Sequence, residues 1–209
     1  MPSHIEKLVE RFSELKSQQN AIQSFVNAIV TAHKKEGKVL LCGNGGSAAD
    51  CEHISGELLK GFLLKRQLSP KKIAQLNKAL GNEKDALSLQ EGVCAIPLVS
   101  LMSGLSAYSN DASATLAFAQ MVYSIGRKQD VLVLLSTSGS STNVVKAAQV
   151  AKAMGIKTVA LVGNDGGKLV EICDTTIIAP ANQTYLIQEY HVSIYHAVCA
   201  EVERVLFDN

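Results

Sequence analysis

Short uninterrupted apolar runs recur along the chain, and most of them lead through a polar loop into a helical pattern. Candidate strands of this kind lie at 38–42, 95–99, 130–135, 158–162 and 175–179. Strands that are apolar on both faces and alternate with helices are typical of a parallel sheet covered by helices on each side. Pro97 cannot donate a ladder hydrogen bond, so its strand is expected at an edge or to end there. The pattern therefore predicts an α/β domain.

Helices are expected at 3–34, 47–60, 112–127, 142–154 and 184–206, with a short one after residue 167. In the first of these, Ser3 is a suitable N-cap and apolar residues recur with a period near 3.6. This stripe is wider than one small sheet covers, so we expect a single long N-terminal helix over 1–34 at a subunit interface. Residues 62–92 are less regular and predict a variable excursion with one short amphipathic helix.

Composition limits the functions that the chain can have. Its 209 residues suit one domain, 1–209, and 47% of them are hydrophobic, as in a globular protein. A net charge of +1 gives no reason to expect nucleic-acid or membrane binding. The sequence has neither a signal-peptide core nor a membrane-length apolar run. Its five scattered cysteines favour a reducing compartment, so we expect a cytoplasmic protein.

Three polar loops, at 43–47, 136–141 and 163–167, follow predicted strands. In parallel sheets, ligands bind at the carboxyl ends of the strands, where these loops would meet. The run Ser136–Ser141 offers hydroxyl donors at the start of a helix, which suits a phosphate monoester, although Ser and Thr are also ordinary N-caps. The glycine loop lacks the Lys-Ser/Thr of a Walker motif and the spacing of a dinucleotide fingerprint, so no nucleotide cofactor is expected.

Acid–base or metal-binding side chains lie on two predicted helices. His53 and Glu57 share a helix face just beyond the glycine loop, although a surface ion pair is the commoner role of that spacing. On the last helix, both Gln188 and Glu189 are compatible with the face of His196, whereas His191 lies about 140° away and is expected to be structural. Two His, one Glu and an amide or carboxylate could bind zinc or move protons without a metal. Spacing does not choose between these two uses.

Five motifs resemble, in order and spacing, the sugar isomerase (SIS) domain of phosphoheptose isomerases. They are Asn44-Gly45-Gly46-Ser47, His53-x-x-x-Glu57, Asn110-Asp111, Ser136–Ser141 and Gln188-Glu189-x-His191-x-x-x-x-His196. The resemblance implies a flavodoxin-like five-stranded parallel sheet and a homotetramer with active sites between subunits. It also implies aldose–ketose isomerisation of sedoheptulose 7-phosphate to D-glycero-D-manno-heptose 7-phosphate, in the biosynthesis of ADP-heptose for bacterial surface polysaccharide.

The same resemblance assigns roles to individual residues. Glu57 matches the family's general base and His196 its general acid. A zinc ion, present in some members, would be bound by His53, Glu57, Gln188 and His196. Substrate-binding roles fall on Asn44, Gly45, Gly46, Ser47, Asn110, Asp111, Ser136, Thr137, Ser138, Ser141 and Gln188.

Two departures leave a related ketose or aldose phosphate open as substrate. Gly61-Phe62 stands where the family often has an Arg-aromatic pair, and Tyr185 stands where it often has an acidic residue. The alternative function is that of a non-catalytic SIS protein, similar to the tetrameric factor that binds the DnaA initiator, or a sugar-phosphate sensor. The DnaA-binding branch lacks the Glu of the His-x-x-x-Glu pair, and this chain keeps Glu57.

Overall fold

A computed structural model describes residues 2–208. Five strands form one parallel sheet in the order β2-β1-β3-β4-β5. The strands are β1 (Val39–Gly43), β2 (Ala95–Pro97), β3 (Val131–Ser136), β4 (Lys157–Val162) and β5 (Thr175–Ile178). The expected α/β fold is confirmed, and the strand that contains Pro97 lies at an edge of the sheet, where its missing N–H leaves no gap in the ladder.

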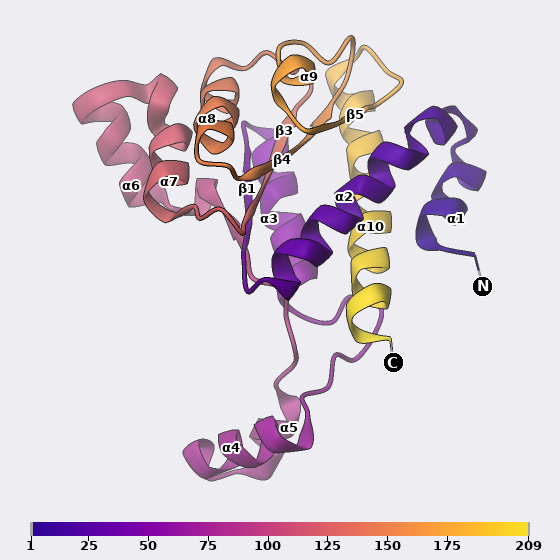
Figure 1. The fold of residues 1–209 in the computed structure, drawn as a ribbon, viewed down its shortest axis with the longest axis vertical. Helices are drawn as coiled ribbons and strands as arrows, with labels where there is room; N and C mark the ends of the chain where they lie inside the picture. The colour runs from indigo at the N-terminus through magenta and orange to yellow at the C-terminus, as the bar shows by residue number, and fades with distance from the viewer. Residues whose placement is uncertain (1, 209) are drawn as a thin grey trace.

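Helices cover both faces of the sheet (Figure 1). The α-helices are α1 (His4–Arg11), α2 (Gln19–Lys34), α3 (Gly46–Leu59), α4 (Pro70–Leu80), α5 (Glu83–Ser88), α6 (Met102–Tyr108), α7 (Ala117–Ile125), α8 (Thr142–Ala153), α9 (Leu169–Ile172) and α10 (Thr184–Phe207). Alternate strand residues point to opposite faces. Leu41 and Val133 pack with α2, α3 and α10, whereas Leu40 and Leu132 pack with α7, α8 and α9. In residues 2–208, no helix is both long and apolar enough to cross a membrane.

The predicted N-terminal helical segment is present, but the prediction that it forms one continuous helix was wrong. The helix α1 ends at Arg11, a 3₁₀ turn covers Ser13–Gln18, and α2 then begins. Phe12 takes φ −124° and ψ 81°, outside the helical region, and its ring packs edge-on against Tyr190 of α10 at 5.8 Å. The apolar stripe is also covered within the chain, since Ile5 and Leu15 are at most 1% exposed. A wide apolar stripe was therefore no argument for a subunit interface, and contact with a second subunit stays a prediction.

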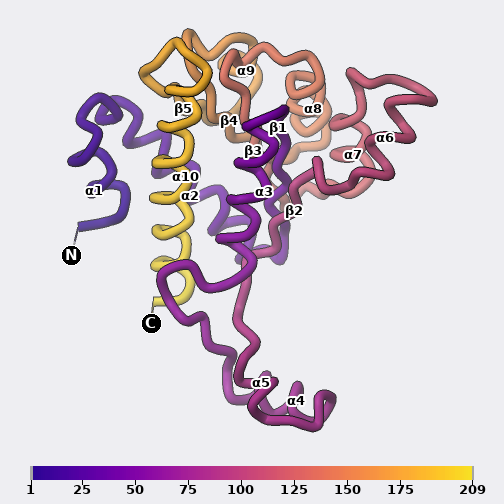
Figure 2. The backbone as a smooth tube through the Cα atoms, turned by 180° about the vertical axis from the view of Figure 1, so that it is seen from behind, coloured from indigo at the N-terminus to yellow at the C-terminus, as the bar shows by residue number. Residues whose placement is uncertain are grey.

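The excursion at 62–92 is an arm with two helices, α4 and α5, where one was predicted. Figures 1 and 2 show both helices standing away from the body, joined to it by two adjacent lengths of chain. Those two lengths meet in a single antiparallel bridge between Gln67 and Gln90. Ser69 and Asn82 cap the two helices with their side chains, and Gly81 ends α4 in the left-handed conformation. The predicted amphipathic helix corresponds to α4, and the short α5, which follows the Asn82 cap, was missed.

A third difference lies between β2 and β3. A helix was expected over 112–127 after a polar turn, but α7 is shorter and α6 precedes it. Between them the chain forms a π-helical turn at Ser109–Ser113 and a 3₁₀ turn at Ala114–Leu116. The helix α6 was missed because its sequence, Met-Ser-Gly-Leu-Ser-Ala-Tyr, buries no residue and so carries no clear apolar period.

Candidate active site

The first turn of α3 lies against α10. Gly45, the N-cap of α3, has φ 56° and ψ −122°, a conformation that favours glycine. At Gly46, an added Cβ would lie 2.3 Å from Nε2 of Gln188, so the amide approaches the glycine closely and would have to shift for any larger residue. Farther along, Tyr195 and His196 of α10 reach His53 of α3. The two helices therefore run side by side in the same direction from the sheet.

Three predicted site residues converge between these helices. Nε2 of His53 lies 3.3 Å from Oε1 of Glu57 and 3.3 Å from Nε2 of His196. The rings of His53 and His196 meet edge to face with centroids 4.9 Å apart, and the ring of Phe62 lies 5.7 Å from that of His196. The structure thus joins His53, Glu57 and His196, which we call the His–Glu–His cluster.

The charge state of His196 follows from its surroundings. Partial burial lowers the pKa of His196 most, the neighbouring His53 lowers it further, and Glu57 opposes both. The ring is therefore neutral at neutral pH and has one nitrogen that can accept a proton. Glu57 has two different neighbours, since Oε1 faces His53 and Oε2 accepts from the Lys60 ammonium at 3.2 Å.

The His–Glu–His cluster fits part of a zinc site. Donors about 2.0–2.1 Å from a tetrahedral zinc ion lie about 3.3 Å from one another, which is the separation of His53 Nε2 from each of its two partners. Imidazole and carboxylate are also ordinary zinc ligands. As it stands, though, the chain over 2–208 contains no group of three or more His, Cys, Asp or Glu side chains arranged to hold a metal ion. The structure therefore shows two of the donor–donor distances of a zinc site, but not a complete set of ligands.

Gln188 lies nearer to the glycine loop than to the cluster. Its amide abuts Gly46, eight residues and about 12 Å of helix before His196. In the described chain, no hydrogen bond connects Gln188 with His53, Glu57 or His196. Its position suits contact with a substrate held over Asn44–Ser47.

The predicted phosphate loop lies where β3 ends and α8 begins. Ser136 is buried and donates to Oγ of Ser141 at 3.2 Å. Ser141 is the N-cap of α8, yet its hydroxyl caps no backbone N–H of that helix. Gly139 has φ 60°, and an added Cβ would lie 1.9 Å from the carbonyl oxygen of Gly166. Hydroxyls and a 12-residue helix N-terminus thus face one loop, which packs tightly against the next.

The three loops at the carboxyl edge do meet. Asn44 and Asn143 exchange two amide hydrogen bonds of 2.9 Å, which join the glycine loop to the start of α8. The amide N–H of Gly163 donates to the carbonyl oxygen of Thr137 at 3.0 Å. Asn143 was not predicted as a site residue, because this pairing depends on how the loops pack. The expected convergence of the loops at 43–47, 136–141 and 163–167 is confirmed.

Asn110 and Asp111 lie apart from the other predicted residues. They lie in the π-helical turn Ser109–Ser113 after α6, where the Asn110 amide donates to Oδ1 of Asp111 at 2.8 Å. Nothing in the described chain brings them to the His–Glu–His cluster. Their role in binding substrate stays a prediction.

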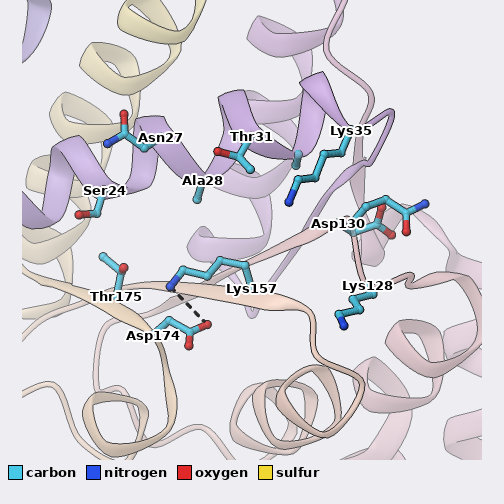
Figure 3. A pocket seen from close by; sticks show the side chains of 12 residues that line it. Ser24, Asn27, Ala28, Thr31, Lys35, Lys128, Asp130, Lys157, Asp174 and Thr175 are labelled. Atoms are coloured by element: carbon cyan, nitrogen blue, oxygen red, sulfur yellow. Dashed lines mark ion pairs between the residues drawn. The ribbon is translucent and has the colours of Figure 1, made fainter.

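Two cavities differ in their relation to these residues. One of about 300 Å³ adjoins His196 and is lined by α1 and Phe62 as well as α10. A larger one of about 540 Å³ lies at the opposite, amino edge of the sheet, between α2 and the starts of β4 and β5 (Figure 3). Its lysines include Lys157, paired with Asp174 at 3.8 Å. The candidate site is therefore not in the larger of these two cavities.

Two further residues were missed by sequence reasoning. Asp50 lies one turn before His53 on α3, and Tyr195 precedes His196 on α10. The hydroxyl of Tyr195 lies 3.2 Å from Oδ1 of Asp50 and 2.9 Å from Nδ1 of His53. Burial raises the pKa of Asp50 most, while the bond from Tyr195 and the nearby His53 oppose that rise. Their separation by 145 residues leaves no signal in the sequence.

The sequence of the chain matches a known protein family. The sequence profile described as the SIS domain matches residues 3–101 and 93–163, which together exceed half of the chain. The chain belongs to the SIS domain family. Among curated SIS relatives, the phosphoheptose isomerase of Helicobacter pylori (strain P12) is 36% identical over 190 residues, covering 91% of this chain and 86% of its own. That of Clostridium acetobutylicum is 39% identical over 186 residues, covering 89% and 83%.

A solved SIS structure agrees with this membership. The phosphoheptose isomerase GmhA from Neisseria gonorrhoeae superposes with a TM-score of 0.74 at 28% identity, covering 96% of this chain and 95% of its own. The recognition of the chain as a member of the phosphoheptose isomerase family is thereby confirmed, together with the five-stranded fold.

Proposed function

We propose that the chain is an aldose–ketose isomerase that interconverts sedoheptulose 7-phosphate and D-glycero-D-manno-heptose 7-phosphate. The observation that carries this proposal is the His–Glu–His cluster, in which the His53 imidazole lies 3.3 Å from both the Glu57 carboxylate and the His196 imidazole. The relatives that share most of the chain's length are named phosphoheptose isomerases. The enzyme is an intramolecular oxidoreductase, because the carbonyl moves between C1 and C2 of one molecule.

Each site residue has a part in this reaction. Glu57 takes the carbon-bound proton at C1 of the ketose, and the pair of electrons left behind forms the enediol; Glu57 then returns a proton to C2. His196 moves the proton between the two oxygens, which suits a ring that is neutral at neutral pH. Ser136, Thr137, Ser138 and Ser141 bind the phosphate, and Asn44–Ser47 with Gln188 hold the sugar.

We propose that zinc is bound by His53, Glu57 and His196, with Gln188 as the fourth donor. The two 3.3 Å separations at His53 Nε2 support the first three ligands, whereas Gln188 is included because of the family resemblance. When bound, the ion would polarise the carbonyl and stabilise negative charge on the enediol oxygens. Asn110 and Asp111 are proposed to reach the sugar from a neighbouring subunit of a cytoplasmic homotetramer, since they lie apart from the site in one chain.

The proposal is tested by turnover on a panel of five- to seven-carbon ketose and aldose phosphates. We expect isomerisation to be fastest with the seven-carbon pair, and the unphosphorylated sugars to serve as controls that react poorly. Inactivity on every sugar phosphate, combined with tight binding of one of them, would contradict the isomerase and favour a sugar-phosphate sensor. Inactivity with binding to the DnaA initiator would favour the replication factor.

A further inference from the structure

His53 is held from behind by a second pair of side chains. On the side away from Glu57 and His196, Nδ1 of His53 lies 2.9 Å from the hydroxyl of Tyr195. That hydroxyl lies 3.2 Å from Oδ1 of Asp50. Tyr195 is 1% exposed and Asp50 is 9% exposed, whereas the side chain of His53 is 46% exposed. A buried pair thus anchors the inner nitrogen of a ring whose outer nitrogen faces the site.

The direction of these hydrogen bonds decides which nitrogen of His53 carries a proton. An ionised carboxylate only accepts, and a tyrosine hydroxyl has one proton to donate. If Tyr195 donates to Asp50, its oxygen is left to accept from His53, so Nδ1 carries the N–H. In a neutral imidazole the other nitrogen, Nε2, then has a free lone pair. This is the atom that lies 3.3 Å from both Glu57 and His196.

The second carboxylate oxygen of Asp50 bears on which group donates to this side chain. Oδ2 of Asp50 is buried and has no hydrogen-bond partner. The hydroxyl of Tyr195 is therefore the donor that the described structure provides for the carboxylate. Asp50 and His53 stand one turn apart on α3, so the phenol from α10 fits between them and ties both to its own helix.

We propose that Tyr195 and Asp50 are positioning residues that keep the Nε2 lone pair of His53 directed at the His–Glu–His cluster. This inference rests on the proposed function, because the cluster is the proposed zinc site. The carboxylate orients the phenol, and the phenol fixes both the tautomer and the plane of the imidazole. Carboxylates, backbone carbonyls and waters behind a metal-binding histidine commonly act in this way, and here a phenol oxygen takes that place.

The test compares Tyr195→Phe with a matched control, Tyr190→Phe. Tyr190 lies on the same helix, but its hydroxyl donates to Glu14 and not to Asp50. In the metal-free proteins, ¹⁵N spectra of the imidazole show which nitrogen of neutral His53 is protonated. We expect Nδ1–H in the wild type and in Tyr190→Phe, and a shift toward Nε2–H in Tyr195→Phe. Zinc affinity, measured against a competing chelator, should fall by about 10–100-fold in Tyr195→Phe alone.

A second variant guards against a folding defect. Asp50→Asn keeps the shape of the side chain but can donate to the phenol oxygen, which would turn the Tyr195 O–H toward Nδ1 of His53. We expect the same change of tautomer there, with a melting temperature that shows the fold is retained. A wild-type His53 that carries its proton on Nε2 overturns the inference. So does a Tyr195→Phe protein with unchanged tautomer and unchanged zinc affinity.

The tautomer measurement separates this inference from the proposed function. A wild type with Nδ1–H that responds to Tyr195→Phe, but isomerises no sugar phosphate, sustains the inference and contradicts the enzyme. An active isomerase with His53 protonated on Nε2 sustains the proposed enzyme and contradicts the inference. Should the wild type bind no zinc, the tautomer alone decides the role of Tyr195 and Asp50.

Discussion

At the scale of single residues, α10 gives two histidines opposite roles. His196 faces the cluster, whereas His191 is completely buried and donates from Nε2 to the carbonyl oxygen of Val162 at 3.2 Å. The helical wheel predicted this division, because five residues turn the second side chain about 140° away from the first. Burial lowers the pKa of His191 to about 4, since the interior disfavours the charged ring.

The buried ring makes stability depend on pH. An unfolded histidine has a pKa near 6.5, so between about pH 6.5 and 4 the unfolded chain binds the extra proton. Stability contributed by neutral His191 is therefore present above pH 6.5 and is lost as pH falls through that window. Between pH 7 and pH 5 we expect a loss of about 2 kcal/mol from this group, measured by urea unfolding. His191→Gln should make the free energy of unfolding depend less steeply on pH between 7 and 5. An unchanged pH dependence would contradict the assignment of this effect to His191.

Sequence reasoning found residues that act through local spacing and missed those that act through packing. His53 and Glu57 share a face because they are four residues apart, and His196 was singled out from the face of the last helix. Tyr195 could not be connected with Asp50, because their contact depends on the register between α3 and α10. The same limit applies to Asn143, whose amide pair with Asn44 joins two loops.

At the scale of elements, one buried ion pair locks the end of α3 to α10. Nε of Arg66 donates to Oε1 of Glu203 at 2.7 Å, and both side chains are fully buried. The same guanidinium donates to the carbonyl oxygens of Leu58 and Glu57. Although burial opposes it, hydrogen bonds from the Phe62 and Leu63 amides and from Arg66 lower the pKa of Glu203. The backbone that carries Glu57 is thus fixed from the far side of the site.

Breaking this pair should be costly. Glu203→Gln keeps the side-chain shape but leaves the charge of Arg66 buried without its partner. We expect a loss of about 3–5 kcal/mol in the free energy of unfolding, measured with denaturant.

The matched control is Glu91→Gln, which breaks the Lys72–Glu91 pair, whose side chains are 55% and 27% exposed. The free energy of unfolding of Glu91→Gln should fall by less than about 1 kcal/mol. Equal effects of the two substitutions would show that the buried pair has no special role.

Periodicity predicted most elements but not their breaks. The strands were found because each is an apolar run between loops. The break at Phe12 was not, because Phe12 continues the apolar period even though its ring leaves the helix to contact Tyr190. In the arm, by contrast, Ser69, Gly81 and Asn82 are recognisable capping residues in hindsight.

At the scale of the whole molecule, the two helices of the arm stand apart from the core (Figure 1). The helix α4 buries no residue, and α5 buries Ala86 alone. Stability depends mainly on buried apolar area, which the arm hardly contributes. Its place between α3 and β2 could be expected from the irregular sequence, but its projection from the body depends on the paired chain at Gln67 and Gln90.

Removing the arm should leave the body folded. Replacing residues 69–88 by a short glycine–serine linker keeps the Gln67–Gln90 bridge close. We expect the free energy of unfolding to change by less than about 1 kcal/mol, which corresponds to about 2–4 °C in melting temperature. Loss of the cooperative transition would contradict this. Light scattering of the same protein reports whether the predicted tetramer persists without the arm.

The central claim is that Glu57 moves the carbon-bound proton, and solvent deuterium exchange into sedoheptulose 7-phosphate tests it most directly. The matched control is Glu52→Gln, on the same helix, where Glu52 is exposed and accepts from Ser100 at 2.9 Å. We predict that Glu57→Gln loses exchange by about 10²–10⁴-fold while still binding the sugar phosphate, and that Glu52→Gln exchanges like the wild type. Exchange by Glu57→Gln at the wild-type rate would contradict the account.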